Sequence, residues 1–479
     1  MLFKQLSIQR HISIIGIFIC CCVSCKKYVQ IAPPTNTITT SQVFADSANA
    51  LSALGGLYAD MINTGSVAFG DGFITVYCGA SADELLPFES SGDQVSTNTL
   101  IASSGVFFNG VWIPAYNYIY RTNAILEGLE SSRGISSAVK DQIRGETKFF
   151  RAFFNFYLVN LFGDVPLITN TNYKTNTLAP QAPMASIYQS IEDDLKDAQS
   201  VLPEDYSAGN GERIRINKWA ATALLARVYL YTNKYDSAEA QASSIINATG
   251  LFSLTDSVND AFLKNSTEAI LQWQINSNLS GANYNATAEE VYFARAPFYP
   301  PTHYLTDQLL AAFEPGDMRK IKWLDSTVYN SGSSTSTYYY PYKYKIGTFQ
   351  RSPGAEPTEY YMVLRLAEQY LIRAEARAQE NDLSGAISDI DAIRNRAGLP
   401  NTTAVSQTDI LGAVAQERRI ELFAEWGHRW LDLKRTGQAH NVLSVIPYKS
   451  QWQDYQQLYP IPPTEMISDP NLKQNPGYY

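Results

Sequence analysis

Apolar side chains recur at steps of three and four residues between Arg365 and Gly398, which predicts two amphipathic helices folded back on one another. Asn381 and Asp382 interrupt the pattern between the two helices, and Gly398 is suited to end the second one in a left-handed conformation. The stretch is therefore interpreted as a helical hairpin. The first helix is expected to bury one stripe, made of Val363, Leu366, Ala367, Tyr370, Leu371, Ala374 and Ala378.

A second stretch, Trp219 to Gly250, repeats this pattern with a loop at Asn233 and Lys234. Its second helix is expected to begin with a capping box formed by Asp236 and Glu239. Small alanines lie twelve residues apart across each loop, which is the spacing that tetratricopeptide helix pairs use for close approach. An unrelated helical pair is the alternative. The alanines are Ala226 and Ala238 in one hairpin, and Ala374 and Ala386 in the other.

The remaining pattern predicts a mainly α fold with one irregular lobe. Tetratricopeptide-like hairpins would form a right-handed superhelical scaffold, and Gly-rich and Tyr-rich segments without a helical stripe would form a loop-rich lobe with short strands. A solvated, partly mobile segment is the alternative for the longer of these. We expect one domain over 41–479, with loops over 65–110 and 251–361 and an extended surface tail over 459–479. Helices are expected over 41–64, 112–250 and 362–435. The first range should be interrupted at Gly55-Gly56, and the last should contain one continuous helix from Thr408 to Trp426.

The composition agrees with this division of the chain. Hydrophobic residues make up 45% of it and charged residues 17%, as in a globular protein, whereas 31 Tyr and 22 Pro require large non-helical segments that carry aromatic rings. The net charge is −9, so nucleic acid is not an expected partner.

The first residues resemble a bacterial lipoprotein signal. Lys4 and Arg10 precede an apolar run over 12–23, and Cys25 follows Ser24. Twelve apolar residues are too few to span a bilayer, which needs ~20. We therefore expect residues 1–24 to be removed and Cys25 to carry the lipid.

Removal of this segment would leave Cys25 and Cys78 as the remaining cysteines, which excludes a disulfide framework. A cut beside Cys21 or Cys22 stays open as an alternative. Residues 25–40 are expected to form an extended tether, because Pro33-Pro34 and several threonines disfavour a helix.

Metal and cofactor chemistry has little support. His303, His428 and His440 are widely spaced, and no two of them share a helical turn. After removal of residues 1–24, the chain would have no Gly-x-Ser-x-Gly elbow, no phosphate-binding glycine loop and no Cys-x-x-Cys motif. We expect no catalytic residue, no metal and no cofactor.

The best enzyme hypothesis is a glycosidase that uses two loop carboxylates. Its candidates are the pairs Asp83-Glu84 and Glu289-Glu290. Acidic pairs in loops usually cap the backbone or face solvent, so this is the weaker hypothesis. The charged run from Gln416 to Glu421 is interpreted as a set of structural ion pairs rather than a catalytic pair.

Four motifs together resemble the SusD/RagB family. They occur in a fixed order and span most of the chain, which makes the combination far more specific than any one of them. They are FGDVP at Phe162 to Pro166, RLAEQYLIRAEARA at Arg365 to Ala378, QERRIELFAEWGHRWLDLKR at Gln416 to Arg435, and YPIP followed by QNPGY within Tyr459 to Tyr479.

The resemblance implies a lipid-anchored outer-membrane binding protein of the Bacteroidota type, and not an enzyme. It would sit as a hinged lid over a SusC-like TonB-dependent transporter and capture oligosaccharide or polysaccharide for import, or peptide in some members. Exposure on the cell exterior is expected. Lys26 and Lys27 stand where exported relatives often carry acidic residues, so the periplasmic face stays open as an alternative.

Glycan recognition needs aromatic planes for the C–H face of a sugar beside polar groups for its hydroxyls. The segments Gly65 to Gly110 and Asn283 to Tyr344 offer this mixture, although aromatic residues in such segments also form small cores. The sequence does not indicate which glycan binds. The ligand-binding candidates are Phe73, Tyr77, Asp83, Phe88, Asn283, Tyr284, Tyr292 and Trp323.

Overall fold

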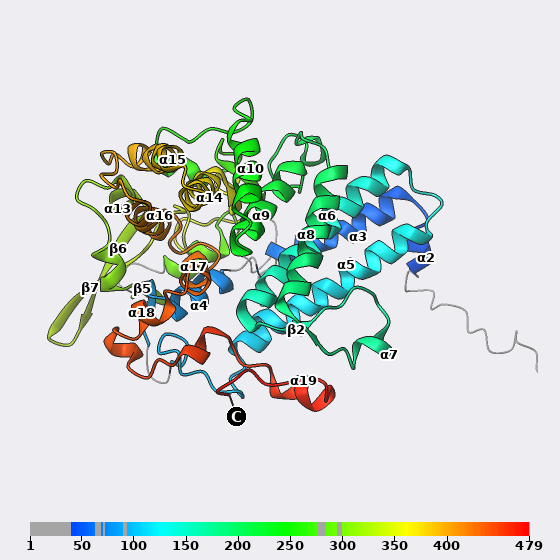
Figure 1. Cartoon of the computed structure of the whole chain (residues 1–479), viewed down its shortest axis with the longest axis horizontal. Coiled ribbons are helices and arrows are strands. Elements are labelled where there is room, and N and C mark those ends of the chain that lie inside the picture. The colour runs from blue at the N-terminus through cyan, green and yellow to red at the C-terminus, as the bar shows by residue number, and fades with distance from the viewer. Residues whose placement is uncertain are drawn as a thin grey trace, which may run out of the picture.

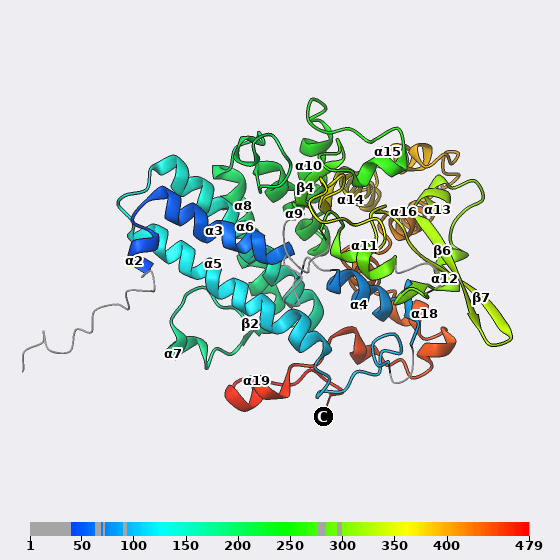
Figure 2. The same cartoon turned by 180° about the vertical axis from the view of Figure 1, so that it is seen from behind.

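The computed structural model describes residues 40–62, 69, 72–89, 93–275, 284–294 and 299–478. The expected signal peptide, Cys25, the tether up to residue 39 and Asn283 lie outside these ranges. Helices fill most of the molecule, and a strand hairpin, β6–β7, projects at the end opposite the first helix, α2 (Thr40–Val43) (Figures 1 and 2). The expected mainly α architecture is confirmed.

The first helices pack side by side along one half of the molecule (Figure 1). The expected interruption at Gly55-Gly56 is wrong, because one continuous helix, α3, runs through both glycines. Its buried face, formed by Leu54, Leu57 and Met61, keeps the helical step across them. The helices are α3 (Ser47–Ile62), α5 (Ile113–Ser131), α6 (Ser137–Phe162) and α8 (Met184–Val201).

Both expected helical hairpins are present. Their alanines are fully buried, and the second helix of the first hairpin packs against the first helix of the second hairpin. The strand β8 takes up Val363 and Arg365, so the first helix of the second hairpin begins only at Leu366. The bounds are α9 (Lys218–Tyr231), α10 (Tyr235–Ile246), α14 (Leu366–Gln379) and α15 (Leu383–Arg396).

The turn of the second hairpin forms as its sequence predicts, whereas the start of α10 in the first hairpin does not. Asn381 takes a positive φ of 66°, and the Asp382 side chain accepts a hydrogen bond from the backbone of Gly385 at 3.0 Å. The capping box expected at the start of α10 is wrong, because the helix begins after Lys234 without a side-chain cap. Glu239 instead accepts a hydrogen bond from Arg377 at 2.7 Å and ties the two hairpins together.

The helix expected from Thr408 to Trp426 ends early. The helix α16 covers Gln407–Glu421, and Ala424 and Trp426 then adopt positive φ angles of 47° and 46° before α17 (His428–Arg435). This turn carries the Trp426 ring inward, where its Nε1 donates to the carbonyl of Met362 at 2.7 Å. Tertiary packing therefore overrides the helical pattern here.

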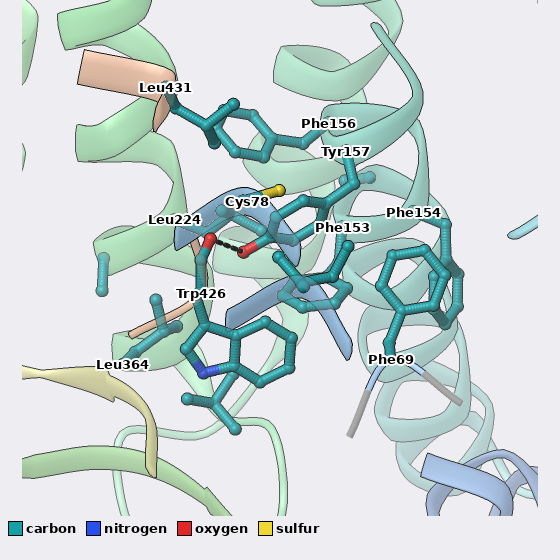
Figure 3. Packing of buried hydrophobic residues seen from close by; sticks show 14 of the residues in the cluster. Phe69, Cys78, Phe153, Phe154, Phe156, Tyr157, Leu224, Leu364, Trp426 and Leu431 are labelled. Carbon is teal, nitrogen blue, oxygen red and sulfur yellow. Dashed lines mark hydrogen bonds between the residues drawn. The ribbon is translucent and has the colours of Figure 1, made fainter. Parts of the chain in front are cut away.

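An aromatic core lies between α6 and the following helices (Figure 3). Phe153, Phe154 and Tyr157 of α6 pack around Phe69 with edge-to-face ring geometry, and Phe153 lies edge-on to Trp426 at 5.3 Å. The Tyr157 hydroxyl donates to the Trp426 carbonyl at 3.4 Å. The core thus joins the first half of the chain to the turn after α16.

The lobe contains short strands, as expected, but also a helix that was not expected. The segment 65–110 includes α4 (Phe73–Ser81), which is largely buried, where only loops and strands were predicted. The strand pairs are antiparallel: β1 (Leu85–Pro87) with β5 (His303–Leu305), β2 (Val165–Pro166) with β3 (Gln181–Ala182), β4 (Ala269–Trp273) with β8 (Tyr361–Arg365), and β6 (Leu324–Ser331) with β7 (Ser334–Pro341). Short helices α11 (Ala288–Phe293), α12 (Asp307–Leu310) and α13 (Met318–Lys322) lie between these strands.

The C-terminal tail is not an extended surface strap, so that prediction is wrong. Tyr459 and Ile461 are fully buried, and a short helix, α19 (Pro463–Ser468), follows. The Asn475 amide donates to the carbonyls of Phe162 and Tyr459 at 2.8 and 2.7 Å. The FGDVP motif and the tail motif therefore meet in space.

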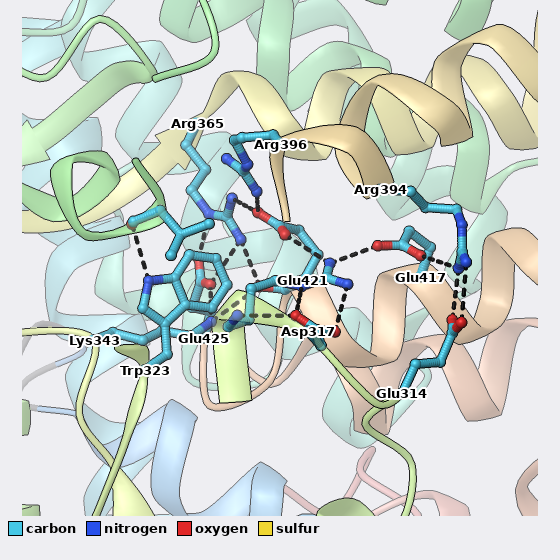
Figure 4. A network of polar contacts seen from close by, with 12 residues as sticks. Glu314, Asp317, Trp323, Lys343, Arg365, Arg394, Arg396, Glu417, Glu421 and Glu425 are labelled. Atoms are coloured by element: carbon cyan, nitrogen blue, oxygen red, sulfur yellow. Dashed lines mark hydrogen bonds and ion pairs between the residues drawn. The ribbon is translucent and has the colours of Figure 1, made fainter. Parts of the chain in front are cut away.

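The charged run in α16 belongs to a buried ion network, which confirms its structural interpretation (Figure 4). Guanidiniums of Arg319, Arg365 and Arg396 converge on Glu421, and Arg365 also binds Glu425 at 2.8 Å. Burial alone would raise the pKa of Glu421, but the three guanidiniums hold it well below its ordinary value. The network joins the lobe to the helical hairpins.

Candidate functional site

The strand hairpin β6–β7 forms one wall of a pocket in the lobe. Its strands pair without a bulge from Leu324 and Pro341 to Ser331 and Ser334. Gly332, in the two-residue turn, has a positive φ of 60°, which fits the tight turns that such hairpins prefer. Threonine and tyrosine side chains give the strands the branched and aromatic character that favours a pleated sheet.

A pocket of about 540 Å³ lies beside this hairpin. Side chains from both faces of β6 line it, so the pocket follows the edge of that strand. The opposite wall comes from residues near the end of α11 and from the loop after the hairpin. Among the lining residues are Phe293, Tyr299, Asp325, Asn330, Tyr340, Tyr342, Phe349 and Gln350.

Two aromatic rings border the pocket in unusually exposed positions. Tyr299 is 63% exposed and Phe349 is 58% exposed. Asp325, Asn330 and Gln350 are also exposed and supply amide and carboxylate groups beside these rings. Apolar planes with adjacent hydrogen-bonding groups are the combination that a sugar ring requires.

Two tyrosines that line the pocket, Tyr340 and Tyr342, have polar partners. The Tyr340 hydroxyl donates to Asp325 at 3.1 Å. The Lys345 ammonium lies 4.1 Å from the centroid of the Tyr342 ring, and burial lowers the pKa of Lys345 to about 8. These contacts fix the orientation of the two tyrosines.

Three of the predicted ligand residues form a separate cluster. Phe73 and Tyr77 pack together on α4 at 4.3 Å between ring centroids, and His303 lies 6.2 Å from Tyr77 and 5.5 Å from Tyr292. None of these residues lines the pocket. The structure brings Phe73, Tyr77 and Tyr292 together as a half-buried aromatic cluster outside the pocket.

Phe88 lies against the same hairpin as the pocket. Its ring packs edge-on to Tyr329 at 5.2 Å and to Tyr338 at 5.3 Å. Tyr338 also contacts Tyr304 at 4.9 Å. These rings support one face of the hairpin and are half-buried.

Asp83 and Trp323 are in the interior, which is at odds with their prediction as ligand contacts. Trp323 is fully buried, and its Nε1 donates to the carbonyl of Val258 at 2.9 Å. Asp83 is 2% exposed and is bound by Arg419 and Arg429. Burial acts in the other direction, but these arginines lower the pKa of Asp83 below its ordinary value.

Tyr284, the remaining candidate within the described residues, is half-buried and has a positive φ of 55°. The guanidinium of Arg351 lies 5.8 Å from its ring centroid. Tyr284 does not line the pocket. Asn283 precedes the described segment, so its candidacy stays a prediction.

The carboxylates of the glycosidase hypothesis are also buried. Glu84, Glu289 and Glu290 are at most 4% exposed, and none of them lines the pocket. Burial first, and Asp83 second, raise the pKa of Glu84 to about 8. Burial raises the pKa of Glu289 to about 8 as well. These groups are placed to be neutral interior carboxyls rather than groups that touch a sugar.

The described part of the chain offers neither a metal cluster nor a membrane-spanning helix. Within it, no cluster of three or more His, Cys, Asp or Glu side chains is arranged to hold a metal ion. Among the same residues, no helix combines the length and the apolar character that crossing a membrane requires.

The pocket residues were missed because their chemistry is ordinary in sequence. The aromatic run from Tyr338 to Tyr344 was a visible signal, since every residue in it except Pro341 and Lys343 is a tyrosine. Tyr299 and Phe349 carry no comparable signal, because Tyr299 only follows Phe298 between two prolines and Phe349 is an isolated aromatic near Gly347. Only the fold brings them to one pocket.

Comparison with protein families gives two matches that together cover most of the chain. Residues 272–478 match a model described as the SusD family, and residues 74–230 match a model described as starch-binding and associating with the outer membrane. SusD-like protein P2 of Formosa agariphila is 25% identical, over 93% of this chain and 95% of the relative. The starch-binding protein SusD of Bacteroides thetaiotaomicron is 25% identical, over 73% of this chain and 75% of the relative.

Solved structures share the fold. A SusD superfamily protein from Bacteroides vulgatus has a TM-score of 0.77 at 21% identity, covering 91% of this chain and 100% of the other. A laminarin-binding SusD-like protein has a TM-score of 0.73 at 26% identity, again covering 91% of this chain and 100% of the other.

Proposed function

This chain belongs to the SusD family, and on that premise we propose that it is a glycan-binding protein that holds its ligand in the pocket beside the β6–β7 hairpin. The observation that carries the proposal is the pair of exposed rings, Tyr299 and Phe349, at the border of a pocket with polar groups between them. A sugar ring would stack on one of these planes while Asp325, Asn330 or Gln350 bind its hydroxyls. Starch and laminarin fragments are the first ligands to try, since similar proteins are named for binding them.

The aromatic residues around the pocket extend the proposed binding surface. Phe88 supports the hairpin through Tyr329 and Tyr338, and Tyr292 adjoins Phe293 of the pocket wall. A longer oligosaccharide would contact these half-buried rings after the pocket is filled. Phe73, Tyr77 and Tyr284 stay candidates for such outer contacts.

We further propose that the protein delivers its ligand to a SusC-like TonB-dependent transporter in the outer membrane. A lipid on Cys25 would hold it there without a membrane-spanning helix. The helices α9 and α14 are almost wholly buried, whereas α10 and α15 keep exposed residues that a partner could contact.

A peptide ligand is the second candidate. Within the described residues β6 pairs only with β7, and the pocket follows the edge of β6. An extended peptide could add to that edge through main-chain hydrogen bonds. Binding of unrelated peptides in place of glycans would favour this candidate.

Alanine variants of the two exposed rings test the proposed site. Tyr299→Ala and Phe349→Ala should each weaken oligosaccharide binding by ~1–3 kcal/mol in calorimetry, with little change in thermal stability, because the rings are exposed. Tyr173→Ala is the matched control, since Tyr173 is 69% exposed on α7 (Tyr173–Asn176) and lies outside the pocket. Unchanged binding in both Tyr299→Ala and Phe349→Ala would place the ligand outside this pocket.

The lipid anchor is tested by Cys25→Ala expressed in the native type of host. The variant should leave the membrane fraction and take up no labelled fatty acid, because the thioether site is lost. Continued partition with washed membranes would contradict the anchor at this cysteine. Purification of the wild type without a co-isolating outer-membrane transporter would count against the proposed partner.

A further inference from the structure

A second cavity is lined by residues of α14, α16, α17 and α18 (Ala439–Leu443), and it shares no lining residue with the pocket beside the β6–β7 hairpin. Its volume is about 500 Å³, within the range of small-molecule sites. Apolar side chains, Leu411, Leu433 and Val442, form part of its wall. The charged part contains four arginines, Arg418, Arg419, Arg429 and Arg435.

Two of these arginines are fixed by a single buried carboxylate. Asp83, which follows α4, lies behind the cavity lining, and its Oδ2 accepts from Nη2 of Arg419 at 2.7 Å and from Nη2 of Arg429 at 3.1 Å. Nε of Arg429 adds a bond to Oδ1 at 2.7 Å. Because one negative charge serves two guanidiniums, the pair keeps one net positive charge.

The other two arginines are already neutralised. Arg435 forms two bonds with Glu375, at 2.5 and 2.7 Å, and Arg418 binds Asp432 at 2.8 Å. A ligand that enters the cavity therefore meets the excess charge at Arg419 and Arg429.

The guanidiniums of Arg419 and Arg429 also have hydrogen-bond donors that a ligand could use. Arg419 and Arg429 keep 16% and 12% of their side chains exposed, and Nη1 of each makes no hydrogen bond to any residue in the described ranges. Burial, with Arg429 adding to it, lowers the pKa of Arg419, so its positive charge is incompletely compensated. An anion between the two guanidiniums would satisfy both the free donors and the charge.

We propose that this cavity binds a small organic carboxylate, with its charged end between Arg419 and Arg429 and its apolar body against Leu411, Leu433 and Val442. A planar carboxylate matches the guanidinium fork, and a single negative charge matches the single excess positive charge. The apolar wall favours a hydrocarbon body over a fully hydroxylated sugar. This cavity is distinct from the pocket beside the β6–β7 hairpin, and binding of a carboxylate to it does not depend on the proposed function.

Calorimetry with benzoate and its neutral counterpart benzamide tests the site on the full chain. Benzoate should bind with a dissociation constant below about 1 mM and at least about tenfold more tightly than benzamide. Arg419→Gln should remove that preference, because Asp83 then balances Arg429 alone. Equal affinity for the two probes in the wild type, or no binding of benzoate up to about 10 mM, would overturn the proposal.

A blocking variant keeps the test decisive if Arg419→Gln fails to fold. Ala415 lies on the cavity wall and is exposed on α16, so Ala415→Trp should fill the cavity without disturbing the core and should abolish benzoate binding. Thr408→Trp is the matched control, because Thr408 is exposed on the same helix and does not line the cavity. Benzoate binding at wild-type strength in Ala415→Trp would show that the probe binds elsewhere.

Discussion

Glu84 shows how burial can set the protonation state of a single residue in this protein. The side chain is 1% exposed, and its Oε2 accepts a bond from the backbone of Ala424 at 3.3 Å. Burial and the neighbouring Asp83 raise its pKa to about 8. In the unfolded chain its pKa is ordinary, near 4.3. The folded protein therefore binds a proton that the unfolded chain releases between these two values.

The stability of the protein should reflect this proton. Because the folded state holds more protons, the contribution of Glu84 to the free energy of unfolding falls as pH rises from about 4.3 to about 8, and is constant above that. Glu84→Gln imitates the neutral carboxyl, so it should raise the thermal midpoint relative to the wild type near pH 8 and change it little at pH ~4. Melting curves at both pH values check this.

The matched control for this prediction is Glu465→Gln, a carboxyl on α19 that is not buried. It should shift the midpoint equally little at both pH values. A Glu84→Gln variant that gains no stability near pH 8 would show that the folded protein holds Glu84 ionised.

For single residues, the sequence was least informative about which side chains form the site. Asp83 and Trp323 have the chemistry of ligand contacts, but partners distant in sequence, such as Arg429 and Val258, bind their polar atoms in the interior. Nothing next to them in the chain indicates those partners. Residue type alone could not distinguish a sugar platform from a core tryptophan.

At the scale of elements, the helical hairpins depend on close approach at their alanines. Ala374 and Ala226 are fully buried, so Ala374→Leu and Ala226→Leu should each overpack the helix contacts and lower the free energy of unfolding by ~1–3 kcal/mol. Denaturant unfolding measures the loss. Ala240→Leu is the control, because Ala240 is exposed on α10 and a leucine there meets solvent. Unchanged unfolding of both core variants would contradict tight hairpin packing.

The hairpins could be predicted because they are local. Their apolar step, the break at Asn381 and the glycine stop at Gly398 all lie within a few turns of each other, and Gly398 does take a positive φ of 78°. The early end of α16 could not be predicted, because it depends on Ala424 and Trp426 adopting positive φ angles to fill a distant core. Non-glycine residues rarely adopt this conformation, so the sequence carries no sign of it.

In the whole molecule, the pocket beside the β6–β7 hairpin exists only because segments that are separate in the sequence meet there. Tyr299, the hairpin strands and Phe349 come from three parts of the lobe, and the ion network around Glu421 fixes that lobe to the helices (Figure 4). The family resemblance predicted such a lobe and a binding role. It could not predict which rings would be exposed, because the motifs that carry it lie mostly in the scaffold.

We propose that the protein retains a glycan without cleaving it. Incubation with starch and laminarin oligosaccharides, followed by measurement of both retention and newly formed reducing ends, tests the claim most directly. We expect retention of at least one glycan that is lost in the Tyr299→Ala, Phe349→Ala double variant, and no new reducing ends. Hydrolysis that Asp83→Asn or Glu84→Gln abolishes, or a complete lack of retention, would contradict it.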